Sequence, residues 1–160
     1  MSHAEHVEKQ ELKDYIQSEA IFKRIFRAYN AVTACRQTAK YSHYDMDMKV
    51  TKKGNIKRYN VEIKERNQDL ETYDELPLTM YKFLSIKESC KNGEIPLIIY
   101  LINDEEYYIF NLNDVCLCEC EVRLWRIQAE QLSANNKKRV EEPTVFIPTR
   151  LARYNGQIHV

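Results

Sequence analysis

The stretch Tyr44-Asp-Met-Asp-Met-Lys-Val-Thr-Lys-Lys-Gly-Asn-Ile-Lys-Arg-Tyr-Asn-Val-Glu-Ile-Lys-Glu-Arg66 decides the fold of this chain. Its two halves each alternate apolar with polar residues, which is the period-2 pattern of paired β-strands. The alternating apolar positions are Met46, Met48, Val50, Tyr59, Val61 and Ile63. Between the halves, the Gly-Asn pair of Lys52-Lys53-Gly54-Asn55 suits the positive φ of a tight turn. The stretch therefore predicts a β-hairpin over about residues 43–66.

The register of this hairpin brings acidic residues together. With the turn centred on Lys53-Gly54, Asp45 lies opposite Glu62, and Asp47 follows on the same face. Directly opposed residues have Cβ atoms about 4.5–5.5 Å apart, so two carboxylates there repel unless a cation lies between them. Lys64, two residues beyond Glu62, points to the same face. The pattern predicts a divalent-metal site with a lysine beside it.

Composition sets the class of protein and one limit on its partners. At 160 residues, 44% hydrophobic and 30% charged, the chain predicts a single globular domain over residues 1–160. Lys and Arg together number 24, as do Asp and Glu, so the net charge is zero. A nucleic-acid partner would therefore need local clustering of positive charge rather than a basic domain.

The N-terminus shows no apolar signal region, and no apolar run reaches the length of a membrane span. We expect an intracellular, cytoplasmic protein that is not secreted and has no membrane partner. Five cysteines without a signal peptide predict reduced thiols. Cys116, Cys118 and Cys120 alternate, so on a strand they would spread along one face, and we interpret them as small buried side chains rather than a zinc site.

A helix is predicted from about Leu12 to Val32, because apolar residues recur there at spacings of three and four. Glu19 lies within this apolar stripe. It is either a charge at the stripe's edge, paired with a lysine, or a residue of a site, because a buried glutamate is rare unless paired or metal-bound.

The remaining elements predict an α/β domain with a mixed central sheet flanked by helices. Residues 33–43 are a short strand or a loop, and residues 115–127 are a strand or a helix. Four further predictions are a helix from Pro77 to Ser89, a doubly buried strand Pro96–Ile102, a turn at 103–106 and a strand Tyr107–Leu112. A polar, basic loop at 133–143 and a short edge strand Val145–Pro148 complete the chain.

This arrangement resembles the PD-(D/E)XK nuclease superfamily, whose restriction-endonuclease-like core has the order αβββαβ. The resemblance covers about residues 12–112, with additional C-terminal elements at 113–160. Its specific part is short: Tyr44-Asp45 in one strand and Val-Glu62-Ile63-Lys64-Glu-Arg in the next.

The resemblance implies roles for these residues. Asp45 and Glu62 would bind Mg²⁺ or Mn²⁺ together with the backbone carbonyl of Ile63. Lys64 would orient or help deprotonate the attacking water and offset charge on the phosphate. Glu19 would reach the site from the first helix.

The sequence also departs from the family pattern. Tyr44 stands where the family name has a proline, and Asp47 is an alternative to Asp45 as the metal ligand. Some members carry a helical Gln-x-x-x-Tyr element, for which only Tyr81 and Lys82 are available here.

Together with the resemblance, these features predict a metal-dependent endonuclease that hydrolyses DNA, with RNA the less favoured substrate. The resemblance implies products with 5′-phosphate ends. The alternative is a catalytically inactive module of the same fold that serves nucleic-acid binding or assembly. By analogy with other small nucleases, the chain could form a homodimer. A basic cluster at the hairpin tip is either a phosphate contact or a solubilising turn; it comprises Lys49, Lys52, Lys53, Lys57 and Arg58.

Overall fold

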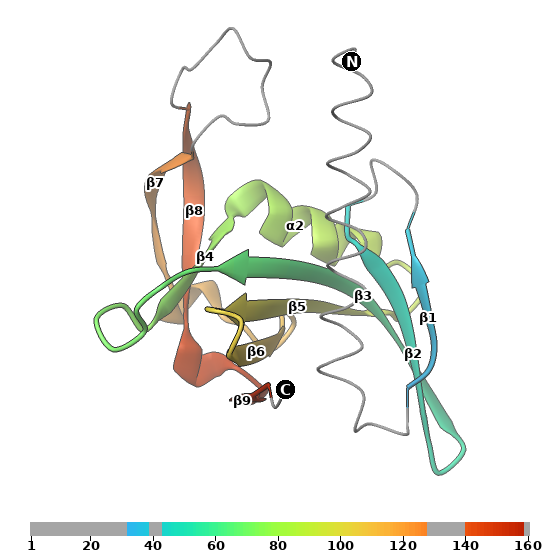
Figure 1. The fold of residues 1–160 in the computed structure, drawn as a ribbon. Helices are drawn as coiled ribbons and strands as arrows, with labels where there is room; N and C mark the ends of the chain where they lie inside the picture. The colour runs from blue at the N-terminus through green and yellow to red at the C-terminus, as the bar shows by residue number, and fades with distance from the viewer. Residues whose placement is uncertain (1–31, 39–42, 128–139, 159–160) are drawn as a thin grey trace, which may run out of the picture.

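The computed structural model describes residues 32–38, 43–127 and 140–158 (Figure 1). The predicted helix over residues 12–32, with Glu19, lies outside the described residues except for Val32, which begins a strand rather than ending a helix. Residues 133–139 of the predicted basic loop also lie outside them.

A six-stranded mixed sheet forms the larger layer of the molecule (Figure 1). Only β3 and β5 pair in parallel; the other neighbours are antiparallel. The predicted mixed central sheet is therefore confirmed. In spatial order its strands are β1 (Val32–Gln37), β2 (Met46–Lys52), β3 (Asn55–Arg66), β5 (Ile95–Ile102), β6 (Glu106–Asn111) and β9 (Tyr154–Gln157).

A smaller antiparallel sheet and a helix cover a face of the large sheet. The small sheet has the order β4 (Glu75–Thr79), β8 (Val140–Pro148), β7 (Glu121–Ile127). Helix α2 (Met80–Ser89) connects β4 to β5 and packs against β3, β5 and β8 (Figure 1). Two short 3₁₀ turns, η1 (Leu117–Glu119) and η2 (Thr149–Leu151), lie beside the small sheet.

The β2–β3 hairpin has the predicted turn and register. Lys53 and Gly54 have φ values of 49° and 79°, and Lys52 lies opposite Asn55. Asp47 lies opposite Asn60, as the turn position requires. Because the register is set by the turn, one face of the hairpin carries the acids and the other carries the apolar side chains.

Strand β5 divides the core into two clusters by its alternation. Leu97, Ile99 and Leu101 pack with β2 and β3 side chains on one face of the sheet. Ile98 and Tyr100 pack on the opposite face, with α2 and the small sheet. Seven of the eight β5 residues are buried, so the predicted doubly buried strand is confirmed.

The prediction that a helix begins at Pro77 is wrong. Pro77 lies within β4, between the buried side chains of Leu76 and Leu78, and the helix begins at Met80 with Thr79 as its N-cap. Among the strands that the structure describes, β4 pairs with β8 alone and is an edge strand, where a missing N–H is tolerated. Burial of the alternating leucines therefore outweighs the preference of proline for a first helical turn. The predicted end at Ser89 is confirmed.

The prediction of a short edge strand at Val145–Pro148 is also wrong. Strand β8 begins at Val140 and is the central strand of its sheet, so residues 140–143 are not loop. Its prolines lie where they disturb the ladder least. Pro148 is the last residue, and Pro143 lies beyond the part of β8 that β4 covers, which begins at Thr144.

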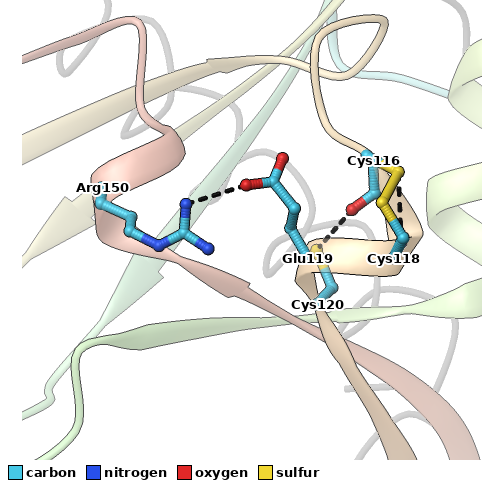
Figure 2. The surroundings of a disulfide bond; sticks show 5 residues. All are labelled: Cys116, Cys118, Glu119, Cys120 and Arg150. Atoms are coloured by element: carbon cyan, nitrogen blue, oxygen red, sulfur yellow. Dashed lines mark hydrogen bonds and ion pairs between the residues drawn. A yellow bond between two sulfur atoms is a disulfide. The ribbon is translucent and has the colours of Figure 1, made fainter.

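The cysteine-rich turn differs from the prediction as well. Cys116 and Cys118 form a disulfide and are exposed, so the prediction of buried, reduced thiols is wrong for this pair (Figure 2). Cys120 is a free, partly buried thiol whose Sγ donates to the Cys116 carbonyl oxygen at 3.4 Å. The physical reason is the 3₁₀ turn η1, which folds the chain back where a strand would have spread the thiols along one face.

Candidate active site

Glu62 is the centre of the candidate site. It lies on β3, and its side chain is only 1% exposed. Oε1 lies 2.5 Å from Nζ of Lys64, and Oε2 lies 3.2 Å from Nζ of Lys82 on α2. A buried carboxylate is costly unless paired, so these two ammonium groups explain how it is tolerated. Despite the proximity of Lys82, Oε2 has no hydrogen-bond donor within the described ranges.

Asp45 lies beside Glu62, directly before β2. Its N–H donates to the Val61 carbonyl at 2.9 Å, and the Ile63 N–H donates to its Oδ2 at 2.8 Å. Burial raises the pKa of the Asp45 carboxyl, and the nearby Glu62 charge raises it further. The Ile63 amide, Lys64 and Lys82 oppose this rise. The two acids therefore repel each other in the protein alone, and a cation between them would relieve the repulsion.

The backbone around Asp45 is held on both sides. Thr38, directly after β1, donates its N–H to the Asp45 carbonyl at 3.0 Å, and its hydroxyl lies 3.1 Å from the same oxygen. On the β3 side, the N–H and C=O of one residue point to the same edge of a strand. The Ile63 carbonyl therefore points to the Asp45 side, beyond the final Met46–Val61 pair of the β2–β3 ladder.

Asp47 is on the same hairpin face but has other partners. It accepts a hydrogen bond of 2.8 Å from the Tyr44 hydroxyl, whose pKa burial and the Asp47 charge raise to about 12. Its cross-strand neighbour Asn60 donates to Oγ of Ser89, the last residue of α2, at 2.9 Å. The charge of Glu62 raises the pKa of the Asp45 carboxyl, whereas Asp47 accepts a hydrogen bond from the Tyr44 hydroxyl.

Lys82 is a site residue that the sequence analysis did not assign. It lies in the first turn of α2, where its backbone N–H donates to the Thr79 cap at 3.2 Å. Its Nζ also donates to the His43 carbonyl at 3.3 Å. A signal was present in the sequence: Ser85 and Ser89 follow Lys82 at helical spacing, and this polar stripe faces the sheet, with Ser85 buried.

The donor set suits a hard divalent cation. Two carboxylates and a backbone carbonyl are oxygen ligands of the kind Mg²⁺ and Mn²⁺ prefer, and Glu62 Oε2 is a buried acceptor without a donor. In the part of the chain that the structure describes, no three His, Cys, Asp or Glu side chains cluster closely enough to hold a metal. A third acid would have to come from elsewhere, and Glu19 lies outside the described residues.

The fold, but no sequence match, relates this chain to known proteins. No family model matches it, and no curated protein matches it. The 1.6 Å structure of Hjc, a Holliday junction resolvase from Archaeoglobus fulgidus, aligns over 88% of this chain and 88% of its own, with a TM-score of 0.51 and 10% identity. A nuclease from a fusselovirus, D212, aligns over 95% of this chain and 88% of its own, with a TM-score of 0.43 and 11% identity.

The chain therefore has the restriction-endonuclease-like fold that it shares with the Hjc resolvase. The resemblance inferred from the Asp45 and Glu62-Ile63-Lys64 stretches is confirmed at the level of the fold. At 10% identity, the likeness does not carry over the activity.

Two further predictions bear on the setting of the site. Among the helical residues that the structure describes, no segment is long and apolar enough to cross a membrane. The cytoplasmic location and the single domain over residues 1–160 stay predictions.

Proposed function

We propose that this protein is a metal-dependent nuclease that hydrolyses phosphodiester bonds of DNA at the Asp45–Glu62 site. The observation that carries the proposal is the buried Glu62 carboxylate beside Asp45, with one lysine at each oxygen. In this arrangement the two carboxylates can bind a metal cation, and the two lysines can offset the negative charge of a phosphate.

Asp45, Glu62 and the Ile63 carbonyl are the ligands we assign to Mg²⁺ or Mn²⁺, with Glu19 as a further acid and Asp47 as the alternative to Asp45. When bound, such an ion activates water for attack and neutralises charge on the phosphate. Support for Asp45 over Asp47 comes from geometry: Oδ2 of Asp45 accepts from the Ile63 N–H, directly after Glu62, whereas Asp47 accepts from the Tyr44 hydroxyl.

The lysines act from two different elements. Lys64 and Lys82 each keep about a quarter of their side-chain surface exposed, so both can meet an anionic substrate from solvent. We assign Lys64 to orienting the attacking water and balancing phosphate charge. Tyr44, with a pKa of about 12, stays protonated at neutral pH and serves as a hydrogen-bond donor to Asp47 rather than as a base.

DNA is the proposed substrate, with RNA less favoured and 5′-phosphate ends as products. The resolvase with the similar fold acts on Holliday junctions, so branched DNA belongs in the substrate panel. A homodimer is part of the proposal, and analytical ultracentrifugation tests it separately.

The test is cleavage of plasmid, single-stranded and four-way-junction DNA in Mg²⁺ or Mn²⁺, with RNA alongside. We expect wild type to cut, and Asp45→Ala and Lys64→Ala to lose at least about 100-fold in rate, within the range typical of a positioned acid–base group. If Lys64→Ala cuts as fast as wild type, the site assignment is wrong.

A catalytically inactive module for nucleic-acid binding or assembly is the second candidate. One observation favours it: the Lys82 ammonium already lies 3.2 Å from the Glu62 oxygen that a metal would need. Under this alternative, wild type binds DNA but cuts none of the substrates in either metal. Calorimetry then shows either no binding of Mn²⁺ or binding that Asp45→Asn leaves unchanged.

A further inference from the structure

The 3₁₀ turn η1 carries a disulfide between two residues at the surface of the protein. Cys116 and Cys118 are bonded, with their Cα atoms 5.2 Å apart, and both residues are exposed (Figure 2). A disulfide opens when an external thiolate attacks one of its sulfur atoms, so the rate of opening depends on access. Both cysteines can therefore meet a thiol reductant while the protein stays folded.

The bond between Cys116 and Cys118 closes a very short loop, since the two residues are only two positions apart in the sequence. The entropy that a cross-link removes from the unfolded chain grows with the logarithm of the loop length. A loop of this length therefore adds little to the free energy of unfolding. Opening the bond costs the fold little, which suits a bond that is broken and formed again.

Contacts other than the disulfide hold η1 in place. The Glu119 N–H donates to the Cys116 carbonyl oxygen at 3.0 Å, and the Cys120 N–H donates to the Leu117 carbonyl oxygen at 3.2 Å. Glu119 also forms an ion pair of 2.9 Å with Arg150 of η2, and η1 contacts β7 and β8 (Figure 2). Because none of these contacts includes a bonded sulfur atom, we expect the turn to keep its place when the disulfide opens.

Cys120 is a third thiol in the same turn, but its surroundings keep it out of the disulfide. It is partly buried, and its Sγ donates to the Cys116 carbonyl oxygen at 3.4 Å. Burial raises the pKa of the Cys120 thiol, and the charge of Glu119 raises it further, against the opposing effect of Arg150. Since the thiolate is the attacking species, Cys120 at neutral pH remains a hydrogen-bond donor. The exposed pair, Cys116 and Cys118, is therefore the reactive one.

From the exposure, the short loop and the independent support of the turn, we infer that Cys116 and Cys118 form a thiol–disulfide exchange site whose substrate is a thiol reductant. A reductant thiolate attacks one of the two sulfur atoms and forms a mixed disulfide with it. The S–S bond breaks, and the other cysteine leaves as a thiolate that takes up a proton.

A second reductant thiolate then attacks the reductant's sulfur in the mixed disulfide. This step releases the oxidised reductant as a disulfide and leaves the second cysteine as a thiolate, which also takes up a proton. Two electrons pass from the reductant to the pair, and the reverse reaction restores the bond. The inference does not depend on the proposed nuclease, whose residues lie on β2, β3 and α2.

The experiment equilibrates the oxidised protein with mixtures of reduced and oxidised dithiothreitol and, in a second series, of reduced and oxidised glutathione. Acid quenching, alkylation with N-ethylmaleimide and intact-mass spectrometry count the free thiols. We expect a reversible gain of two labels, which Cys116→Ser and Cys118→Ser both lose. The matched controls Cys90→Ser and Cys120→Ser each remove a free thiol and should keep the gain. A gain with both reductants assigns the site to thiols in general, and a gain with dithiothreitol alone assigns it to dithiols.

The rate of reduction separates an exchange site from a purely structural disulfide. Because the pair is exposed, dithiothreitol should open it in the native protein within about tenfold of the rate in concentrated urea. Circular dichroism should show cooperative thermal unfolding both before and after reduction. A native rate about 100-fold or more below the rate in urea would overturn the inference, because opening would then require unfolding. Loss of cooperative unfolding on reduction, failure of the bond to form again, or loss of the two-label gain in Cys120→Ser would also overturn it.

Discussion

The two ends of one hairpin face place like-charged residues in opposite surroundings. At the inner end, Asp45 and Glu62 are shielded from water, and Glu62 needs two lysines. At the outer end, Lys49 and Arg58 repel each other across the ladder, but water screens them. Burial, rather than cross-strand pairing, therefore decides how strongly a charge affects the free energy of unfolding.

The largest expected effect is at the buried end of the face. Glu62→Gln keeps the side-chain shape but leaves Lys64 and Lys82 facing each other without an anion. We expect a loss of about 2 kcal/mol, less than for a fully buried pair because both lysines can reach water. Urea denaturation measures it, with the exposed Glu65→Gln as the control, expected within about 0.5 kcal/mol. Equal losses of unfolding free energy in Glu62→Gln and Glu65→Gln would contradict the conclusion that burial decides how strongly a charge affects stability.

Lys82→Met separates the roles of the two lysines. Glu62 then keeps only Lys64, and we expect a loss of about 1 kcal/mol in the metal-free protein. Because Lys82 lies at the oxygen without a hydrogen bond, its removal should tighten Mn²⁺ binding several-fold. Calorimetry measures the affinity, with the exposed Lys91→Met as the control. Weaker Mn²⁺ binding in Lys82→Met would show that the ammonium does not compete with the ion.

Asp45→Asn should raise the free energy of unfolding, because it keeps an acceptor for the Ile63 amide while removing the repulsion from Glu62. The folded-state pKa of Asp45 is raised, so its contribution to stability is present at low pH and is lost as pH rises through that pKa. The variant should therefore gain on wild type between acid and neutral pH, by up to about 1 kcal/mol. Urea denaturation from pH 3.5 to pH 7 measures the difference, and a gain that is constant with pH contradicts the repulsion.

The smallest effect is expected at the outer end. Arg58→Gln should change the free energy of unfolding by less than about 0.5 kcal/mol, with a slight gain at low salt because the repulsion from Lys49 disappears. Thermal unfolding at 20 mM and 500 mM NaCl measures it, and the gain should vanish at the higher concentration. A loss as large as that of Glu62→Gln would mean that the two ends are equivalent.

Features that depend on neighbouring residues could be predicted from the sequence, whereas features that depend on distant segments could not. The hairpin turn, its register and the doubly buried strand Pro96–Ile102 were predictable, since each depends on neighbouring residues. Pro77 was assigned wrongly because its fit to a first helical turn competed with the burial of Leu76 and Leu78, which β8 decides. The Cys116–Cys118 disulfide was missed because a three-residue turn, not a strand, joins the two thiols.

By itself, the sequence determined which face of the hairpin carries Asp45, Asp47 and Glu62, because a turn centred on Lys53-Gly54 allows one register. Only the tertiary structure decided that Glu62 is buried and that Lys82 is its second partner. These two residues are 20 positions apart in the sequence, and the packing of α2 on β3 brings them together. The alternation of side chains along a strand decides on which face a residue lies. Its burial and its ion pairs with distant residues depend on the elements that pack over that face.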